Sequence, residues 1–218
     1  MVAIVALILS SAALLLQPMQ ERNAEIEKKS NILASVNVEA NEENAEELYD
    51  KYITESFAIN SEAERVEGVD PFNVDVKKEQ RKPLDEQVFP LFVASLDDGS
   101  RSYIVPLQGK GLWGPIWGYI SLNEDMRTIN GATFDHSAET PGLGAEINES
   151  WFENQFIDKS LFENGEFVGI TVQKGGAEED DPHAVDAVSG GTITSKALQE
   201  MIYDGLVNYV EFLEKNTD

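Results

Sequence analysis

Residues 186–195 read Asp-Ala-Val-Ser-Gly-Gly-Thr-Ile-Thr-Ser, and they stand directly before the clearest helical pattern of the chain. Gly190 and Gly191 allow the backbone to turn tightly and to approach a ligand closely. A helix starting here points its free amide groups and its positive dipole end back toward the loop, where a phosphate group would be stabilised. The alternative is a plain glycine turn with a Ser or Thr helix cap. A Walker-type phosphate loop is excluded, because neither the spacing nor the lysine fits.

The elements around this stretch predict an α+β fold. Apolar residues recur at helical spacing from about 196 to 215, and Thr194 or Ser195 can cap the start of this helix. Strands are predicted at 89–96, 102–105, 117–122, 127–134 and 167–172, and a short helix at 149–156. Several strands with one or two packed helices are typical of an α+β domain.

The first residues predict a membrane anchor. Residues 2–16 form an almost unbroken apolar run that stops at Gln17 and Pro18. The run is shorter than the roughly 20 apolar residues of a full span. Charged sequence follows it, however, which argues against a buried core helix. A signal peptide is disfavoured, because no basic residue precedes the run and no convincing cleavage site follows it. We also expect the natural chain to begin further upstream.

Three parts are predicted: an anchor at 1–18, a helical and acidic stalk and linker at 19–87, and a folded domain at 88–218. Within the stalk, residues 45–53 place Leu48, Tyr52 and Ile53 on one helical face. Basic residues follow the anchor and none precedes it. Taken literally, the positive-inside rule would leave the domain in the cytoplasm. An N-terminus missing from the sequence would remove the other half of that comparison.

Composition excludes several classes of function. The 218 residues carry a formal net charge of -24, which argues against nucleic acid as a partner. There is no cysteine, so the chain has no disulfide, thiolate metal site or cysteine nucleophile. The two histidines, His136 and His183, form no metal-ligand pattern, and no metal site is predicted.

The stretch at 186–195 resembles the flavinylation motif of the FMN-binding domain family. In that family a flavin transferase joins FMN through its phosphate to the threonine that corresponds to Thr192. The matching residues, which the resemblance identifies as cofactor-binding, are Asp186, Ser189, Gly190, Gly191, Thr192 and Thr194. Gly191 stands where the family usually has alanine, which exchanges one small residue for another. The resemblance implies an FMN-binding domain with an antiparallel sheet, packed helices and one N-terminal transmembrane helix.

A second stretch, residues 136–144, resembles the His-x-x-Glu-Thr-Pro-Gly-Leu-Gly loop that lies against the flavin in this family. The resemblance assigns cofactor contacts to His136, Glu139, Thr140, Gly142, Leu143 and Gly144. Glu139 and Thr140 are expected at polar edges of the flavin or its ribityl chain. The alternatives are a plain turn at Pro141 and Gly142, and a hydrogen-bonded structural role for His136, which we favour over catalysis.

A third stretch, residues 109–120, is rich in glycine and tryptophan and resembles the C subunits of the sodium-translocating NADH:quinone oxidoreductases. Leu112, Trp113 and Trp117 are assigned to the flavin site on this basis. Tryptophans beside glycines can pack on an isoalloxazine ring. The alternative is that Trp113 and Trp117 are core residues.

The resemblance implies an electron-transfer subunit that relays electrons through covalent FMN, with no catalytic side chain of its own. Its partners would be the other membrane, flavin and iron–sulfur subunits of the same reductase. Its location would be a bacterial inner membrane, crossed once, with the domain on the periplasmic side. Two alternatives stay open. One is the homologous G subunit of an ion-translocating electron-transport complex, and the other is a membrane-tethered binding module without redox function.

Overall fold

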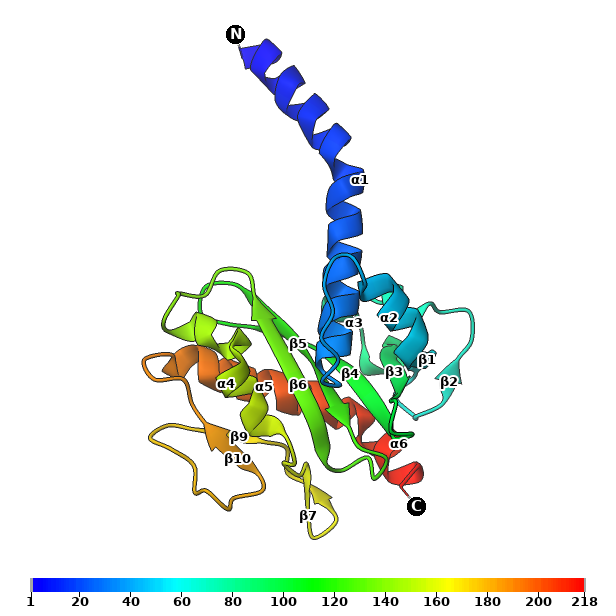
Figure 1. Ribbon diagram of the computed structural model, residues 1–218, viewed down its shortest axis with the longest axis vertical. Helices are drawn as coiled ribbons and strands as arrows, with labels where there is room; N and C mark the ends of the chain where they lie inside the picture. Colours follow the sequence, from blue (N-terminus) through cyan, green and yellow to red (C-terminus); the bar gives the residue numbers. More distant parts are fainter. Residues whose placement is uncertain (1, 218) are drawn as a thin grey trace.

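The computed structural model describes residues 2–217 and places an antiparallel sheet at the centre of the domain (Figure 1). Its six strands lie in the order β2-β1-β3-β4-β5-β6. Their bounds are β1 (Ile53–Ile59), β2 (Arg65–Val66), β3 (Phe89–Ser95), β4 (Arg101–Lys110), β5 (Pro115–Leu122) and β6 (Ile129–His136). The predicted α+β fold with an antiparallel sheet and packed helices is confirmed.

Helices and short strands surround this sheet. The helices are α1 (Val2–Ala34), α2 (Ala45–Tyr52), α3 (Val76–Glu79), α4 (Ser150–Glu153), α5 (Thr192–Leu206) and α6 (Val210–Lys215). The short strands are β7 (Phe162–Glu163), β8 (Glu166–Phe167), β9 (Thr171–Gln173) and β10 (Ala184–Asp186). Single 3-10 turns occupy Pro71–Asn73, Leu84–Glu86, Gly144–Asn148, Asn154–Phe156 and Val207–Tyr209.

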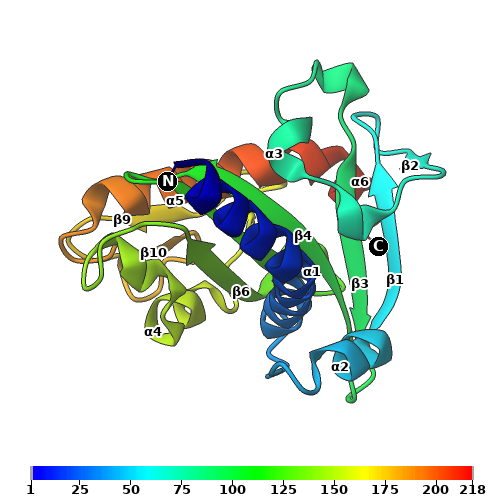
Figure 2. The ribbon, with the colours of Figure 1, turned by 90° about the horizontal axis from the view of Figure 1, so that it is seen from above.

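Both faces of the sheet carry apolar side chains, because successive side chains of a strand point to opposite faces. Helices cover each of the two faces. On β3, Leu91 and Val93 join the cluster under α5, whereas Phe92 and Ala94 join the cluster under α1. The α5 side holds the larger core, to which α5 contributes Leu198, Met201, Ile202 and Leu206. Figure 2 shows α1 and α5 running on opposite sides of β4. The start of α5 is therefore held by a large apolar core, which gives the loop before it a fixed support.

α1 joins the domain to the predicted anchor without a break. Its first part is exposed, including Leu7, Leu15 and Met19, whereas Ile32 and Leu33 near its end are fully buried. Figure 1 shows the N-terminal half of α1 standing well clear of the domain. Among residues 2–217, α1 alone is long and apolar enough to cross a membrane.

Two secondary-structure predictions are corrected by the structure. The predicted linker contains β1, which pairs with β3, so the sheet draws on residues before 88. The sequence pattern for this strand was weak, because only Phe57, Ala58 and Ile59 of β1 are buried. The predicted strand at 167–172 is wrong as one element. Gly169, with a positive φ of 69°, interrupts it between β8 and β9.

Glu153 gives the fold a testable pH dependence. Its Oε1 accepts a hydrogen bond of 2.7 Å from the Phe134 amide, and burial raises the pKa of its carboxyl to about 7. Since the folded pKa lies above the unfolded value of about 4.3, this carboxyl lowers stability as the pH rises from about 4 to about 7. We expect Glu153→Gln to raise the free energy of unfolding by about 1 kcal/mol at about pH 8 and to change it little at about pH 4.

Chemical unfolding of both proteins across that pH range measures this difference. Glu163→Gln is the matched control, because Glu163 is exposed on a short hairpin. Parallel stability curves for wild type and Glu153→Gln would contradict the assignment.

Candidate functional site

The three stretches singled out in the sequence meet at one cavity of about 240 Å³ beside the start of α5. The predicted residues that line it are Leu112, Trp113, Glu139, Thr140, Leu143, Gly144, Gly190, Gly191, Thr192 and Thr194. The β4–β5 loop, the loop after β6 and the loop before α5 each contribute to this set. The structure thus brings together residues up to 82 positions apart, from Leu112 to Thr194.

Thr192 is the first residue of α5, and its side chain is exposed. Gly190 precedes it with a φ of 74°, which favours glycine, and a Cβ there would lie 2.6 Å from Leu143 Cδ2. Within the helix, the Ser195 amide is the one that donates to the Gly191 carbonyl. The amides of Thr192, Ile193 and Thr194 precede that first bond and belong to the anion-attracting end of the helix. The hydroxyl of Thr192 therefore stands, accessible, where a phosphate group is favoured.

Glu139 lies deep in the same site. Its side chain is buried, and Oε1 accepts a hydrogen bond of 2.9 Å from the Trp113 amide. Oε2 accepts a hydrogen bond of 2.6 Å from the Thr194 hydroxyl, which is itself buried. The sequence predicts a polar contact from Glu139 to the flavin. In the structure each carboxylate oxygen accepts one hydrogen bond from a protein donor, and the contact to the flavin stays a prediction.

Exposed apolar side chains surround the mouth of the cavity, and we call these four residues the apolar collar: Leu112, Trp113, Leu143 and Ile193. Trp113 is 67% exposed and Ile193 is 59% exposed. Exposed apolar side chains gathered around a concave site are typical of a surface that receives a ligand or a partner. Ile193 was not predicted, because it occupies a variable position of the motif.

Ionisable groups are scarce in this cavity. Glu139 is the one charged side chain among its lining residues. Across residues 2–217, no three His, Cys, Asp or Glu side chains are grouped so that they could hold a metal ion. The site accordingly has hydrogen-bonding and apolar groups for holding a cofactor, but no acid–base pair that would perform chemistry by itself.

Some predicted residues lie beside this cavity without lining it. His136 ends β6, and its Nδ1 accepts a hydrogen bond of 3.3 Å from the Glu139 amide. Gly142 is exposed with a φ of 74°, and its amide donates to Glu146 Oε1. Ser189 is an exposed residue of the loop before α5. His136 and Gly142 therefore hold the loop after β6 through hydrogen bonds, and Ser189 belongs to the loop before α5.

Asp186 lies at the end of β10, away from the lining residues. Its Oδ1 accepts a hydrogen bond of 2.7 Å from the Ala177 amide, and the side chain borders a separate hollow with Glu178 and Glu179. In this structure Asp186 holds the loop between β9 and β10 through its hydrogen bond with Ala177.

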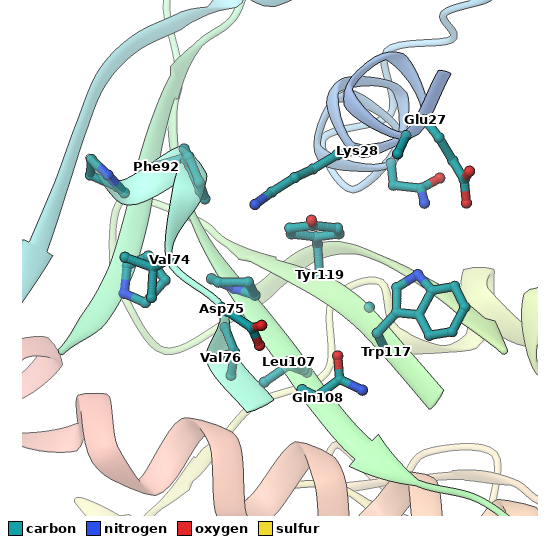
Figure 3. Close-up of a pocket in the computed structure, with 16 residues that line it drawn as sticks. Glu27, Lys28, Val74, Asp75, Val76, Phe92, Leu107, Gln108, Trp117 and Tyr119 are labelled. Carbon is teal, nitrogen blue, oxygen red and sulfur yellow. The ribbon is translucent and has the colours of Figure 1, made fainter. Parts of the chain in front are cut away.

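Trp117 is also separated from the cavity at Thr192. It lines a different cavity of about 310 Å³, together with Lys28 of α1 and Tyr119 (Figure 3). The reason is the period of two along β5, where Ile116 and Ile120 face the α5 core and Trp117 and Tyr119 face α1. Trp113 precedes the strand, in the loop, and is free of this constraint. The structure therefore corrects the assignment of Trp117 to the same site as Trp113.

Comparison with known proteins agrees with this geometry. Residues 111–207 match the family model of the FMN-binding domain, a span that includes every residue lining the cavity at Thr192. The C subunit of the Na(+)-translocating NADH-quinone reductase of Haemophilus ducreyi is 31% identical over 210 residues, covering 89% of this chain and 81% of that protein. The corresponding protein of Vibrio alginolyticus is 31% identical over 212 residues, covering 88% and 81%.

Solved structures are similar as well. The crystal structure of the corresponding C subunit from Parabacteroides distasonis superposes with a TM-score of 0.84 at 45% identity, covering 91% of this chain and 96% of that one. That of NqrC from Shewanella oneidensis gives a TM-score of 0.73 at 26% identity, covering 90% and 99%.

Proposed function

This chain belongs to the family of C subunits of the Na(+)-translocating NADH-quinone reductases, and from that membership we propose that it carries FMN covalently on Thr192 and relays electrons within such a complex. Its relatives are subunits of an oxidoreductase complex, and the chain contains the FMN-binding domain. The observation that carries the proposal is the exposed Thr192 hydroxyl at the start of α5, inside the cavity where three distant loops meet.

The residues present fit FMN. The apolar collar offers flat and branched surfaces for an isoalloxazine ring, and the first turn of α5 offers amide groups for a phosphate. At about 240 Å³, the cavity is smaller than the roughly 300–1,000 Å³ of pockets that enclose a drug-sized ligand. FMN held here would therefore stay partly uncovered, which suits the exchange of electrons with a partner.

Attachment requires a flavin donor whose phosphorus carries a leaving group. The Thr192 Oγ–phosphorus bond forms, the bond from phosphorus to the leaving group breaks, and the hydroxyl proton passes to the transferase or to water. No side chain in the cavity is placed to perform this step, because Glu139 is engaged by Trp113 and Thr194. We therefore assign the chemistry to a separate flavin transferase, which reaches Thr192 because this residue is exposed.

FMN supplies electron transfer in single steps, and the protein supplies tethering, orientation and local electrostatics. The names of the relatives indicate a complex of several subunits that oxidises NADH, reduces quinone and moves sodium. We assign those reactions to partner subunits with flavin or iron–sulfur centres. The exposed apolar collar supports a role in transfer at a protein surface.

α1 supports a single-pass anchor in a bacterial inner membrane. Its exposed apolar residues from Val2 to Met19 suit lipid, and its buried end joins the sheet. The family membership favours the periplasmic side for the domain. Labelling of the domain in intact cells by a reagent that does not cross the membrane tests this orientation.

The intact mass of the whole protein tests the central proposal. We expect one added FMN-phosphoryl unit after co-expression with a flavin transferase, and in-gel flavin fluorescence that survives denaturation. The control is a transferase that modifies a known substrate in the same cells. If the protein then still has its unmodified mass, the proposal is wrong and a binding module without redox function is favoured.

A further inference from the structure

Glu139 connects the three segments that form the site. It belongs to the loop after β6, and its two oxygens reach the Trp113 amide at 2.9 Å and the Thr194 hydroxyl at 2.6 Å. Trp113 lies in the β4–β5 loop, and Thr194 lies in the first turn of α5. One side chain thus bridges three parts of the chain that have no sequence proximity.

Two glycines leave the room that this carboxylate occupies. A Cβ on Gly111 would lie 2.5 Å from Glu139 Oε1. A Cβ on Gly144 would lie 2.6 Å from Glu139 Oε2 and 2.4 Å from Thr194 Oγ1. Because real Cβ atoms do not approach so closely, the space around both oxygens depends on glycine at these positions.

The contacts of Glu139 are hydrogen bonds rather than an ion pair. Glu139 is 5% exposed, and none of the salt bridges found among residues 2–217 involves it. Removing a carboxylate from water is unfavourable unless donors replace the water. Hydrogen bonds to a carboxylate are among the stronger ones, so the two donors hold Glu139, and Glu139 in turn holds them.

We propose that Glu139 is a positioning residue that ties the first turn of α5 to the Trp113 loop and so holds Thr192 and the apolar collar in the arrangement that receives the flavin. This inference rests on the proposed attachment of FMN to Thr192. Thr194 shares a helical turn with Thr192, so a fixed Thr194 also fixes the direction of the Thr192 hydroxyl. The Trp113 amide fixes the backbone from which the exposed Trp113 ring projects.

Three variants separate positioning from direct contact with the cofactor. Glu139→Ala removes both acceptors. Glu139→Gln keeps the shape, since its amide oxygen can accept from the Trp113 amide and its NH₂ can donate to the Thr194 oxygen. Thr194→Val removes one donor at nearly constant volume. Glu149→Gln is the matched control, because Glu149 is exposed and its side chain makes no capping bond.

Two measurements on the full-length protein are needed. Amide hydrogen exchange on the flavin-free protein reports the mobility of residues 111–114 and 192–196. Initial rates of FMN attachment, followed by intact mass with a purified flavin transferase, report the presentation of Thr192. We expect Glu139→Ala to exchange faster in both segments and to attach FMN roughly tenfold more slowly. A tenfold change corresponds to the loss of about one charge-assisted hydrogen bond.

Glu139→Gln is expected to stay within about twofold of wild type in both measurements, because its hydrogen bonds are retained. Thr194→Val should slow attachment in the wild-type background but add little in Glu139→Ala, since coupled residues are not additive. Wild-type exchange and attachment in Glu139→Ala would overturn the proposal. So would a Glu139→Gln variant that attaches FMN as slowly as Glu139→Ala while its exchange is normal, since the carboxylate would then act on the cofactor itself.

A failure of the proposed function is distinguishable from a failure of this inference. If wild type never acquires FMN, attachment to Thr192 is wrong, while the exchange measurements on flavin-free protein still report whether Glu139 orders the two loops.

Discussion

Replacing Thr192 with valine abolishes covalent attachment of FMN and leaves the fold intact: this is the result we expect from the position of the residue. Valine keeps the branched shape and loses the hydroxyl that would form the proposed ester. The side chain is exposed at the first position of α5, so the substitution opens no cavity in the core. The free energy of unfolding should change by less than about 1 kcal/mol. Intact mass and in-gel fluorescence after co-expression with the transferase measure the effect.

Two neighbouring variants control this experiment. Thr192→Ser restores a hydroxyl at the same position and should recover the added mass. Thr194→Ala should still carry FMN once the reaction is complete, because the Thr194 hydroxyl is buried and donates to Glu139. If Thr192→Val protein kept its covalent flavin, the attachment site would lie elsewhere.

Replacing Gly144 with alanine should have the second largest effect on FMN attachment, because the new methyl group would displace buried side chains of the site. The added methyl group would stand 2.4 Å from Thr194 Oγ1 and 2.6 Å from Glu139 Oε2, so one of these side chains must leave its place. We expect the free energy of unfolding to fall by about 1–3 kcal/mol, as for other overpacked sites. The initial rate of FMN attachment should fall by more than about tenfold, since Thr194 and Thr192 share the turn that moves.

Gly142→Ala is the control from the same loop. Gly142 has a φ of 74°, but a Cβ there would meet nothing within 4 Å. The expected cost is therefore backbone strain alone, about 1 kcal/mol, with an attachment rate close to wild type. Equal attachment rates for both alanine variants would show that the space beside Glu139 does not matter.

The sequence predicted the parts of the fold that are marked by apolar runs or by apolar residues at helical spacing. β3 to β6 carry near-continuous runs of buried residues, and α5 carries buried residues at helical spacing. β1 was missed because Thr54, Glu55 and Ser56 are exposed in its first half, so its pattern resembles a polar linker. A strand of this kind is recognised by its pairing with β3, which is a property of the folded chain.

The site was predicted less completely than the fold. The motif resemblance assigned Thr192, Leu143 and Trp113 to one site, and in the structure they line one cavity. It also assigned Trp117 to that site, but β5 directs Trp117 to the opposite face of the sheet. Ile193 and Gly111 were not predicted, although one lines the cavity and the other makes room for Glu139. Their roles depend on distances between loops, which spacing along the chain does not contain.

The continuity of α1 has a consequence for the orientation of the domain relative to the proposed anchor. At about 1.5 Å per residue, its 33 residues follow a helical path of roughly 50 Å, whose far end is packed against the sheet through Ile32 and Leu33. The path is bent (Figure 1), as expected for a helix with a proline, Pro18, inside it. The proposed membrane segment and the part of α1 that packs on the domain therefore belong to one continuous helix. Inserting a single residue between Pro18 and Ile26 would turn the domain by about 100° about the axis of the helical segment that follows Pro18. If the chain is anchored as proposed, the direction in which Thr192 faces neighbouring subunits is set by the number of residues in a helix that lies outside the site.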